Sequence, residues 1–466
     1  MKLSRHTLFY DNYPTPGEYL VFNTRTQAIM ELNQQVKDLI DRAISRNSCC
    51  VVRSSEQTNN KQQTTNNDLL DFTAEEQDYL NTLKESGIII EDNLDETRVM
   101  EHWFNQIKYQ TKTLDVTILT TYQCNFGCVY CFEERVKKDK LLDQTTANQI
   151  IEWLKHKVEE KRPELLRLVF YGGEPLMNPK PILDISRTLN NWCSEKGIKF
   201  VFGIVTNGSL IKENLVDEML KSGLSSIRVT LDGDREHHDR NRPFLDGRGS
   251  FDAIIKNISA IIDKVRIEIS GNFDKNNLGS FSALLDYLEH KGLSKKIGKI
   301  LFAPIVARLG EPGKSHTPPS VEMVGCHSLS NELSDDAIRL RRELIERGYN
   351  VDPAAVVTSC PMGHDNSMVV IDPYGDIYKC EAFVGRQDFS IGNVSENSFN
   401  YRQVEFMTAN TWKQCLDCVY VPMCGGGCRY MAQLKHSDYS KVACDIEYYQ
   451  KIFPELLKMD YERGAL

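Results

Sequence analysis

Between residues 114 and 308 the sequence alternates six times between a short apolar run and a longer helical pattern. Strands that alternate with helices pair in parallel, because a parallel connection must be long enough to cross the sheet. We therefore expect an α/β fold at residues 111–310, in which a parallel sheet closes partly into a (β/α)6 barrel. The predicted strands cover residues 114–120, 165–171, 199–205, 226–231, 264–270 and 299–306.

A different pattern precedes the barrel and predicts a small N-terminal α+β domain at residues 1–110. The polar tract at residues 54–68, SSEQTNNKQQTTNND, has too few apolar residues to pack and is expected to be a loop. Strand signals and helical patterns fall at residues 18–24, 26–44, 73–86 and 86–92.

Residues 311–466 form a third region, with a helical pattern at 335–348, then short strands, turns and many of the chain's 14 cysteines. Its apolar residues follow no regular pattern, so we expect bound metal to hold this region together. Four cysteines at residues 415–428 have the spacing CX2CX5CX3C of a metal site. Spacing alone leaves zinc and an iron-sulfur cluster both open, because both take thiolate ligands.

Composition excludes several classes of protein. The chain of 466 residues is 41% hydrophobic and 26% charged, as in ordinary soluble enzymes, and its net charge of -9 argues against a nucleic-acid partner. No apolar run is long enough for a signal peptide or a membrane span, so we expect a cytoplasmic protein without membrane contact. Disulfides rarely persist in the cytoplasm, which leaves buried thiols, metal ligands or catalysts as roles for the cysteines.

Polar and glycine-rich motifs follow the first four predicted strands of the barrel. Because parallel strands all end on the same side, these motifs should meet at one edge, where barrel enzymes place their chemistry. The motifs are a three-cysteine loop after strand one, Gly172-Gly173-Glu174 after strand two, Thr206-Asn207-Gly208 after strand three and Thr230-Leu231-Asp232-Gly233 after strand four.

The three-cysteine loop favours iron over zinc in this first site. Cys124, Cys128 and Cys131 supply three thiolates, whereas a structural zinc site needs four protein ligands. A cubane of four irons held by three cysteines keeps one iron free for another ligand. On the catalytic edge of a barrel, we expect that ligand to be a cofactor.

The spacing CX3CX2C, with aromatic Tyr130 before its last cysteine, resembles the signature of radical S-adenosylmethionine (SAM) enzymes, which have a TIM-like partial barrel. The resemblance implies a [4Fe-4S] cluster whose unique iron binds SAM. It also implies reductive cleavage of SAM to a 5'-deoxyadenosyl radical that abstracts a substrate hydrogen, with an electron donor such as flavodoxin or ferredoxin.

Other motifs of the barrel are similar to SAM-binding motifs of that family. Gly172, Gly173 and Glu174 resemble its GGE motif, in which the glycines let the backbone approach the methionine moiety and the carboxylate accepts from its ammonium. By the same resemblance Asn207 would lie near the ribose, with Thr230, a threonine in place of the usual serine, also around the cofactor. Arg242 could pair with the SAM carboxylate; without the resemblance, its segment reads as a solvated charged loop.

The C-terminal cysteines resemble the SPASM domain, which carries two auxiliary [4Fe-4S] clusters, for three clusters in all. The similarity rests on Cys360, then Gly375 and Cys380, then the CX2CX5CX3C run and a last Cys444. It implies a nearer cluster with Cys360, Cys380 and Cys428 as ligands. It implies a distal cluster with Cys415, Cys418, Cys424 and Cys444 as ligands.

The nearer cluster lacks a fourth thiolate in this assignment. Ala354 stands where sulfatase maturases supply a cysteine, so either Cys326 is a ligand or one iron is open to the substrate. Glu381 replaces the aspartate that acts as base in those maturases; it is kept as the candidate catalytic base. The remaining cysteines are expected to be packed thiols: Cys49, Cys50 and Cys193.

The N-terminal domain favours one substrate class. Sulfatase maturases begin almost directly with the radical loop, whereas many SPASM enzymes that modify peptides carry a domain that captures a leader peptide by strand addition. Residues 18–32 read as a hairpin feeding a helix, which suits that role, although a structural cap is an alternative.

We therefore expect a radical SAM/SPASM maturase that crosslinks a ribosomal precursor peptide by a thioether or carbon-carbon bond. The alternatives are an anaerobic sulfatase maturase that forms formylglycine and a non-catalytic, zinc-stabilised peptide-binding protein.

Overall fold

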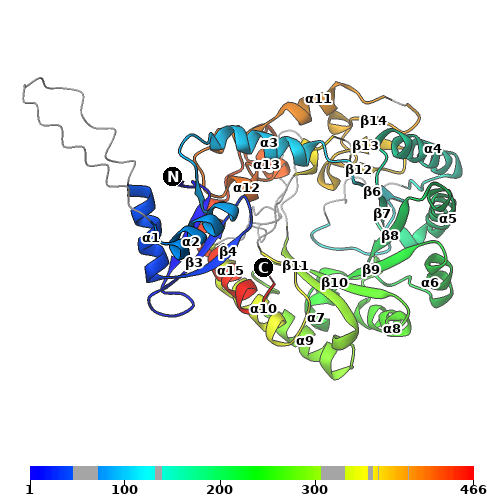
Figure 1. Cartoon of the computed structure of the whole chain (residues 1–466). Coiled ribbons are helices and arrows are strands. Elements are labelled where there is room, and N and C mark those ends of the chain that lie inside the picture. The colour runs from blue at the N-terminus through cyan, green and yellow to red at the C-terminus, as the bar shows by residue number, and fades with distance from the viewer. Residues whose placement is uncertain are drawn as a thin grey trace, which may run out of the picture.

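The computed structural model describes residues 1–45, 72–131, 139–305, 331–354, 360–365, 367–396 and 398–465. A large curved sheet with outer helices forms one side of the molecule, and the N-terminal and C-terminal segments lie together on the other side (Figure 1).

The six predicted barrel strands are confirmed, and they pair in parallel in chain order. They are β6 (Thr113–Leu119), β7 (Leu165–Tyr171), β8 (Lys199–Thr206), β9 (Leu224–Thr230), β10 (Arg266–Phe273) and β11 (Ile297–Pro304). The helices of this region are α4 (Gln144–Lys161), α5 (Pro179–Lys196), α6 (Glu213–Leu220), α7 (Arg235–Asn241), α8 (Phe251–Ile261), α9 (Ser280–His290) and α10 (Asn331–Glu346).

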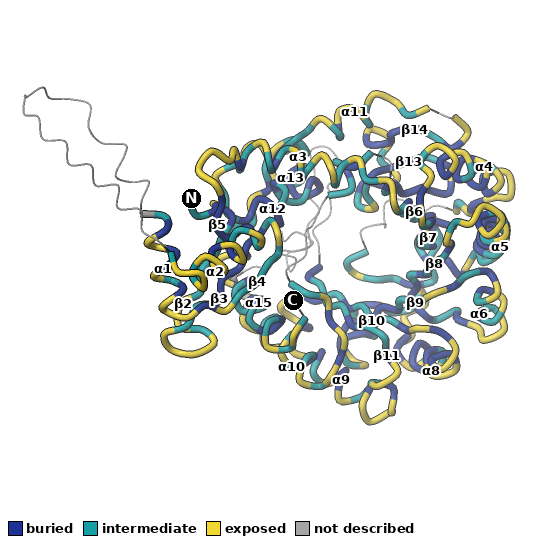
Figure 2. The backbone as a smooth tube through the Cα atoms, in the orientation of Figure 1, coloured by how far each residue is buried: buried dark blue, intermediate teal, exposed yellow. Residues whose placement is uncertain are grey.

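Alternation along the strands separates a dry face from a polar one. On β7, Leu166, Leu168 and Phe170 are fully buried in the main core, whereas Arg167 between them is exposed. Successive strand residues point to opposite faces, so the apolar set packs beneath the helices and the polar set lines the inner side of the curve. In Figure 2 the exposed residues gather on the outer helices, and the strands are buried or half-buried.

The sheet continues beyond the six barrel strands into the cysteine-rich region. β12 (Met368–Ile371) pairs in parallel with β6, and β13 (Asp376–Tyr378) and β14 (Gly392–Asn393) follow in antiparallel order, which makes nine strands. The region predicted at 311–466 therefore shares a sheet with the barrel. Its further helices are α11 (Tyr401–Thr408), α12 (Val421–Cys424), α13 (Arg429–His436), α14 (Ile446–Lys451) and α15 (Phe453–Glu462).

The described residues of the N-terminal segment form two small sheets and three helices. The two-stranded sheet joins β1 (Lys2–Leu3) to β5 (Ile89–Ile90), and the three-stranded antiparallel sheet has the order β2 (Thr7–Asp11), β3 (Glu18–Asn23), β4 (Ile29–Asn33). The helices are α1 (Gln34–Ser45), α2 (Ala74–Glu85) and α3 (Glu96–Lys108).

The predicted hairpin feeding a helix is confirmed by β3, β4 and α1, but the predicted helix at 26–44 is wrong over its first part. Residues 29–33 form a strand instead, with Met30 opposite Val21. The hydrogen bonds of the β3 ladder override the local helical pattern, because strand pairing depends on a partner that lies outside the window of the pattern.

The three-stranded sheet is packed on both faces. Val21 and Leu32 belong to a core with α1 and α2, whereas Phe22 packs on Phe453 of α15 with ring centroids 5.8 Å apart. The N-terminal domain is therefore docked on the cysteine-rich C-terminal region. Among the described residues, no helix has the length and apolar character needed to cross a membrane.

Candidate active site and cysteine groups

The loop after β7 lies directly against the three-cysteine loop after β6. The backbone N–H groups of Gly173 and Glu174 donate to the carbonyls of Thr121 (3.0 Å) and Gln123 (2.8 Å). A Cβ atom added to Gly173 would lie 2.2 Å from the Gln123 carbonyl oxygen, and one added to Gly172 would lie 2.4 Å from that of Thr121. The resemblance assigned these glycines to contact with a cofactor; the structure supplies another reason, the close approach of the cysteine loop.

Glu174 ties the second and third loops together. Its carboxylate is fully buried and accepts from the Leu176 N–H (2.9 Å), the Thr206 hydroxyl (2.7 Å) and the Asn207 N–H (2.7 Å). Burial raises the pKa of Glu174, and these three hydrogen bonds oppose the rise. The carboxylate is thus held in one orientation beside the cysteine loop.

Asn207 reaches the first cysteine. Its Nδ2 donates to the Asn125 side chain (2.8 Å) and lies 3.9 Å from Cys124 Sγ. The Phe126 N–H also donates to Cys124 Sγ, at 3.4 Å. The predicted cofactor residue and the predicted ligand are therefore neighbours, as expected if both line one site.

Residues 241–245 run alongside the cysteine loop. The N–H groups of Gly127 and Val129 donate to the carbonyls of Pro243 (2.8 Å) and Asn241 (3.1 Å), and the N–H of Leu245 donates to that of Asn125 (3.0 Å). The segment is an ordered part of the site rather than the solvated loop that its charges alone suggest.

Arg242, Tyr130 and Asp232 form a buried polar cluster at this site. Arg242 Nη1 donates to the Tyr130 hydroxyl (2.6 Å), which donates in turn to the Asp232 carboxylate; Arg242 Nη1 is 4.0 Å from that carboxylate. Asn272 Nδ2 donates to the same hydroxyl at 3.1 Å. Burial alone would lower the pKa of Arg242, but its polar neighbours Tyr130, Cys128 and Asp232 outweigh burial and raise the pKa.

Asp232 and Asn272 were not assigned a role by sequence reasoning. The sequence signal for Asp232 was its place after β9 in the TLDG motif, whereas Asn272 carries no motif. The Asp232 N–H donates to buried His238 Nδ1 (3.2 Å), so α7 also supports the cluster. Thr230 is buried nearby, with its Oγ1 3.1 Å from Ser270 Oγ.

Four C-terminal cysteines line a single cavity. Cys415, Cys418, Cys424 and Cys444 share it with apolar neighbours that include Val421. A Cβ atom on Gly427 would lie 1.8 Å from the Ala443 carbonyl oxygen, so glycine is needed where the loops that carry Cys424 and Cys444 meet. The four cysteines are the ones assigned to a distal cluster.

A second group contains Cys360, Cys380 and Cys428. Burial, followed by the negative field of Cys360, raises the pKa of the Cys380 thiol, and Cys428 adds to the rise. Cys326, the predicted fourth ligand, lies outside the described residues. Ala354 packs instead with Cys418 and Cys424 against the core around Phe453. Cys193 is buried in α5, as expected for a packed thiol; Cys49 and Cys50 lie outside the described residues.

The two cysteine groups do not by themselves select a metal. Within the described parts of the chain, no three His, Cys, Asp or Glu side chains converge closely enough to hold one metal ion. Zinc and iron-sulfur clusters both take thiolate ligands, so the two clusters stay a prediction for these groups.

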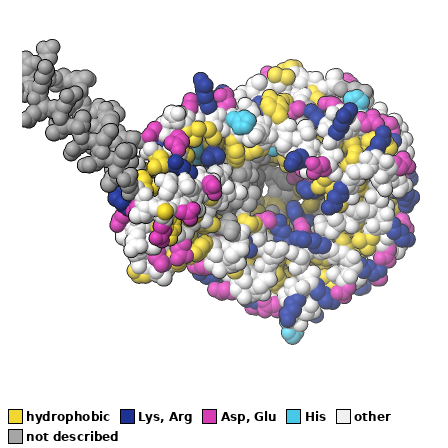
Figure 3. Space-filling view, in the orientation of Figure 1, with side chains coloured by type: hydrophobic (Ala, Val, Ile, Leu, Met, Phe, Trp, Pro, Cys, Tyr) yellow, Lys and Arg dark blue, Asp and Glu magenta, His cyan; other side chains and the backbone are white. Residues whose placement is uncertain are grey.

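Glu381 lies on the inner side of the curved sheet. Its exposed carboxylate accepts from the Thr117 hydroxyl of β6 at 3.2 Å, and Arg228 of β9 acts on it electrostatically. Desolvation by the protein atoms around the carboxylate raises the pKa of Glu381, and these two neighbours oppose the rise. The space-filling view in Figure 3 is hollowed at its middle, with Lys and Arg side chains around the hollow.

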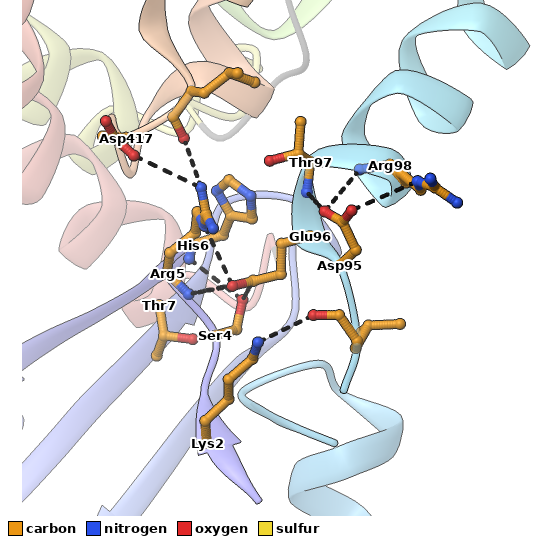
Figure 4. Close-up of polar contacts among 12 residues, drawn as sticks. Lys2, Ser4, Arg5, His6, Thr7, Asp95, Glu96, Thr97, Arg98 and Asp417 are labelled. Atoms are coloured by element: carbon orange, nitrogen blue, oxygen red, sulfur yellow. Dashed lines mark hydrogen bonds and ion pairs between the residues drawn. The ribbon is translucent and has the colours of Figure 1, made fainter. Parts of the chain in front are cut away.

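The N-terminal domain contacts the loop that carries Cys415 and Cys418. Arg5 Nη1 donates to the Leu416 carbonyl (3.2 Å), and Thr24 Oγ1 donates to the Val419 carbonyl (2.5 Å). Glu96, at the start of α3, fixes the segment that contains Arg5. Its carboxylate accepts from Ser4 Oγ (2.7 Å) and from the Arg5 N–H (Figure 4).

Comparison with known proteins is consistent with this geometry. Residues 118–273 match the family model of the radical SAM superfamily. A cysteine-type anaerobic sulfatase-maturating enzyme of Clostridium novyi is 25% identical over 337 residues, which cover 66% of this chain and 85% of the relative. The radical SAM cyclopropyl synthase TigE of Paramaledivibacter caminithermalis is 23% identical over 409 residues, or 80% of this chain and 81% of the relative.

One solved fold extends over nearly the whole chain. The structure of Streptococcus suis SuiB bound to its precursor peptide SuiA covers 96% of this chain and 99% of its own, with a TM-score of 0.52 and 16% identity. At this identity the likeness concerns the fold alone.

Proposed function

Because the chain carries a radical SAM domain at residues 118–273, we propose that it is a radical SAM/SPASM maturase of a ribosomally made precursor peptide. Hydrogen abstraction from a residue of the precursor would be followed by oxidative closure of a thioether or carbon-carbon crosslink. The observation that carries the proposal is the cavity lined by Cys415, Cys418, Cys424 and Cys444, with an N-terminal domain docked on its CX2C loop.

The residues of the barrel have defined parts in this proposal. Cys124, Cys128 and Cys131 would hold a [4Fe-4S] cluster with one iron open to SAM; bound together, the two groups supply a radical that abstracts hydrogen. Glu174 has one carboxylate oxygen with a single described donor, the Asn207 N–H, and so retains capacity for the SAM ammonium.

Arg242 is the residue placed for an anionic group. Its Nε is buried and has no hydrogen-bond partner among the described residues, beside Tyr130 and Cys128. A buried donor without an acceptor is costly, so a ligand carboxylate at this point would be stabilised. We assign the SAM carboxylate to Arg242, the ribose to Asn207 and Thr230, and a wall of the same site to Tyr130.

The two C-terminal cysteine groups would hold two auxiliary [4Fe-4S] clusters, whose chemistry is acceptance of the second electron of the oxidation. Glu381 would take a proton from the substrate, a role supported by the exposure of this residue and by its contact with Thr117 of β6. An external reductant, such as flavodoxin or ferredoxin, would supply the first electron.

Leader recognition is assigned to the N-terminal domain. In the described structure β4 is an edge strand, paired with β3 on one side only. An edge strand offers unpaired backbone donors and acceptors to an extended peptide. The fold shared with SuiB over 96% of this chain includes this domain.

The second candidate is an anaerobic sulfatase maturase, which the relative of Clostridium novyi favours. That relative spans only 66% of this chain, and Glu381 stands in place of the expected aspartate. The proposal of a peptide maturase gives the N-terminal domain a role, so we prefer this proposal to the sulfatase maturase.

The test uses the full chain purified and reconstituted without oxygen. We expect about twelve irons per chain, release of 5'-deoxyadenosine with a reductant, and loss of two hydrogen atoms from a precursor peptide encoded beside the gene. Bound zinc in the absence of sulfide would contradict the proposal that the chain is a radical SAM enzyme. Formation of an aldehyde on a sulfatase peptide, with the precursor unchanged, would select the second candidate.

A further inference from the structure

Arg429 is a buried cation without a carboxylate partner. In the described structure two arginines are less than one-tenth exposed, Arg242 at 9% and Arg429 at 5%. Arg242 lies beside the Asp232 carboxylate, but no described carboxylate forms an ion pair with Arg429. Arg341, in the same C-terminal half, forms an ion pair with the buried Asp460 at 2.7 Å. A buried charge left uncompensated is strongly destabilising.

Among the described residues, the side-chain hydrogen bonds of Arg429 all go to backbone carbonyls. Nε and Nη2 donate to Gly427 (3.2 and 2.8 Å), Nη2 also donates to Gly426, and Nη1 donates to Tyr439 (3.3 Å) and Lys441 (3.2 Å). These contacts fix the guanidinium between two loops and satisfy its donors. Carbonyl dipoles carry no net charge, so a counter-charge must come from elsewhere.

The groups that act electrostatically on Arg429 are cysteines of both C-terminal groups, which become negative as metal-bound thiolates. Burial lowers the pKa of Arg429, and the fields of Cys360, Cys428, Cys424 and Cys415 oppose the fall. The Arg429 backbone N–H also donates to the Cys360 thiol. Cys360 and Cys428 belong to the nearer group, and Cys415 and Cys424 belong to the distal one. The carbonyls of Gly426 and Gly427, which accept from the guanidinium, lie between Cys424 of the distal group and Cys428 of the nearer one, so the guanidinium lies beside both groups.

We infer that Arg429 is the shared counter-charge of the two auxiliary sites and favours the more reduced state of the clusters held there. The inference rests on the cluster assignment in the proposed function. A cluster becomes more negative when it gains an electron, and a fixed cation nearby stabilises that state in a medium of low dielectric constant. Removing the cation should make electron acceptance by the auxiliary clusters less favourable.

The test compares three variants of the full, iron-loaded chain. Arg429→Gln removes the charge, Arg429→Lys keeps the charge but loses most of the carbonyl contacts, and Arg402→Gln removes a charge that pairs with Glu405 on the surface of α11. Iron and sulfide are counted first. The reduced fraction of each cluster is then followed by electron paramagnetic resonance, at potentials set with dithionite and mediator dyes.

We expect the Gln variant at position 429 to show an about tenfold lower ratio of reduced to oxidised auxiliary cluster at a fixed potential, a shift of ~59 mV for one electron. The radical SAM cluster, Arg429→Lys and Arg402→Gln should stay at parental values. Loss of auxiliary iron in Arg429→Gln but not in Arg429→Lys would also support the role of the positive charge at position 429.

Two results would overturn the inference alone: parental potentials in a fully loaded Arg429→Gln protein, or a Lys variant that behaves like the Gln variant. The second result would show that the carbonyl contacts matter and the charge does not. A parental chain without auxiliary clusters would instead overturn the proposed function together with this inference.

Discussion

Arg242 Nη1 donates a hydrogen bond of 2.6 Å to the hydroxyl of Tyr130, and this contact joins the segment after α7 to the three-cysteine loop. The two residues are 112 positions apart in sequence. Asp232, just after β9, accepts from the same hydroxyl, so the loop after β6, the loop after β9 and the segment after α7 meet at one phenol. This arrangement sets the first prediction.

Replacing Asp232 with asparagine should weaken SAM binding about tenfold, or ~1.4 kcal/mol, because the buried carboxylate that orients Tyr130 and Arg242 loses its charge. Isothermal titration of the iron-loaded protein with SAM measures the effect. Asp246→Asn is the matched control, since Asp246 is exposed and pairs with Arg248. Equal affinities in the two variants would contradict a positioning role for Asp232.

Replacing Cys128 with alanine should abolish release of 5'-deoxyadenosine while about eight irons remain bound, because the C-terminal cysteine groups belong to other loops. Product analysis by chromatography and an iron assay on the same sample provide both measurements. If this variant still cleaved SAM at the parental rate, the three-cysteine loop would not hold the reactive cluster.

Replacing Gly173 with alanine should destabilise the protein by roughly 1–3 kcal/mol and displace the cysteine loop, since the added Cβ would lie 2.2 Å from the Gln123 carbonyl oxygen. Thermal unfolding and SAM cleavage report the two effects. At Gly279 an added Cβ meets nothing within 4 Å, so Gly279→Ala is the control. A Gly173→Ala protein as stable as this control would refute the close approach.

His6 makes stability depend on pH at the junction shown in Figure 4. Its ring is fully buried, and burial lowers its pKa from 6.5 to about 4. In the unfolded chain His6 binds a proton as the pH falls below 6.5, whereas in the folded chain it does so only near pH 4. The free energy of unfolding therefore decreases as the pH falls from 6.5 to 4.

The His6 contribution amounts to about 2 kcal/mol lost between pH 7.5 and pH 5. His6→Phe should remove that part of the pH dependence, measured as the urea midpoint at each pH. His290→Phe, at an exposed position of α9, should leave the slope at the parental value. A slope unchanged in His6→Phe would mean that the ring is protonated or hydrated in the folded protein.

Local features of the sequence were enough to predict the six barrel strands and the placement of their motifs. Apolar runs of strand length, separated by helical patterns, need only neighbouring residues to be recognised, and strand ends then follow from the chain itself. The CX3CX2C loop is similarly local, with its three cysteines inside eight residues. The same local reasoning failed at residues 29–33, where the pairing with β3 decides the structure.

Only the tertiary structure decided which distant groups meet. Three features involve partners that are far apart along the chain. They are the cavity lined by four cysteines, the pairing of β12 with β6, and the burial of Arg242 and Arg429. A pattern states that a residue is charged, but whether that charge is solvated, paired or enclosed depends on what packs around it. That is why Arg429, one residue beyond a predicted ligand, gained a role only when its surroundings were known.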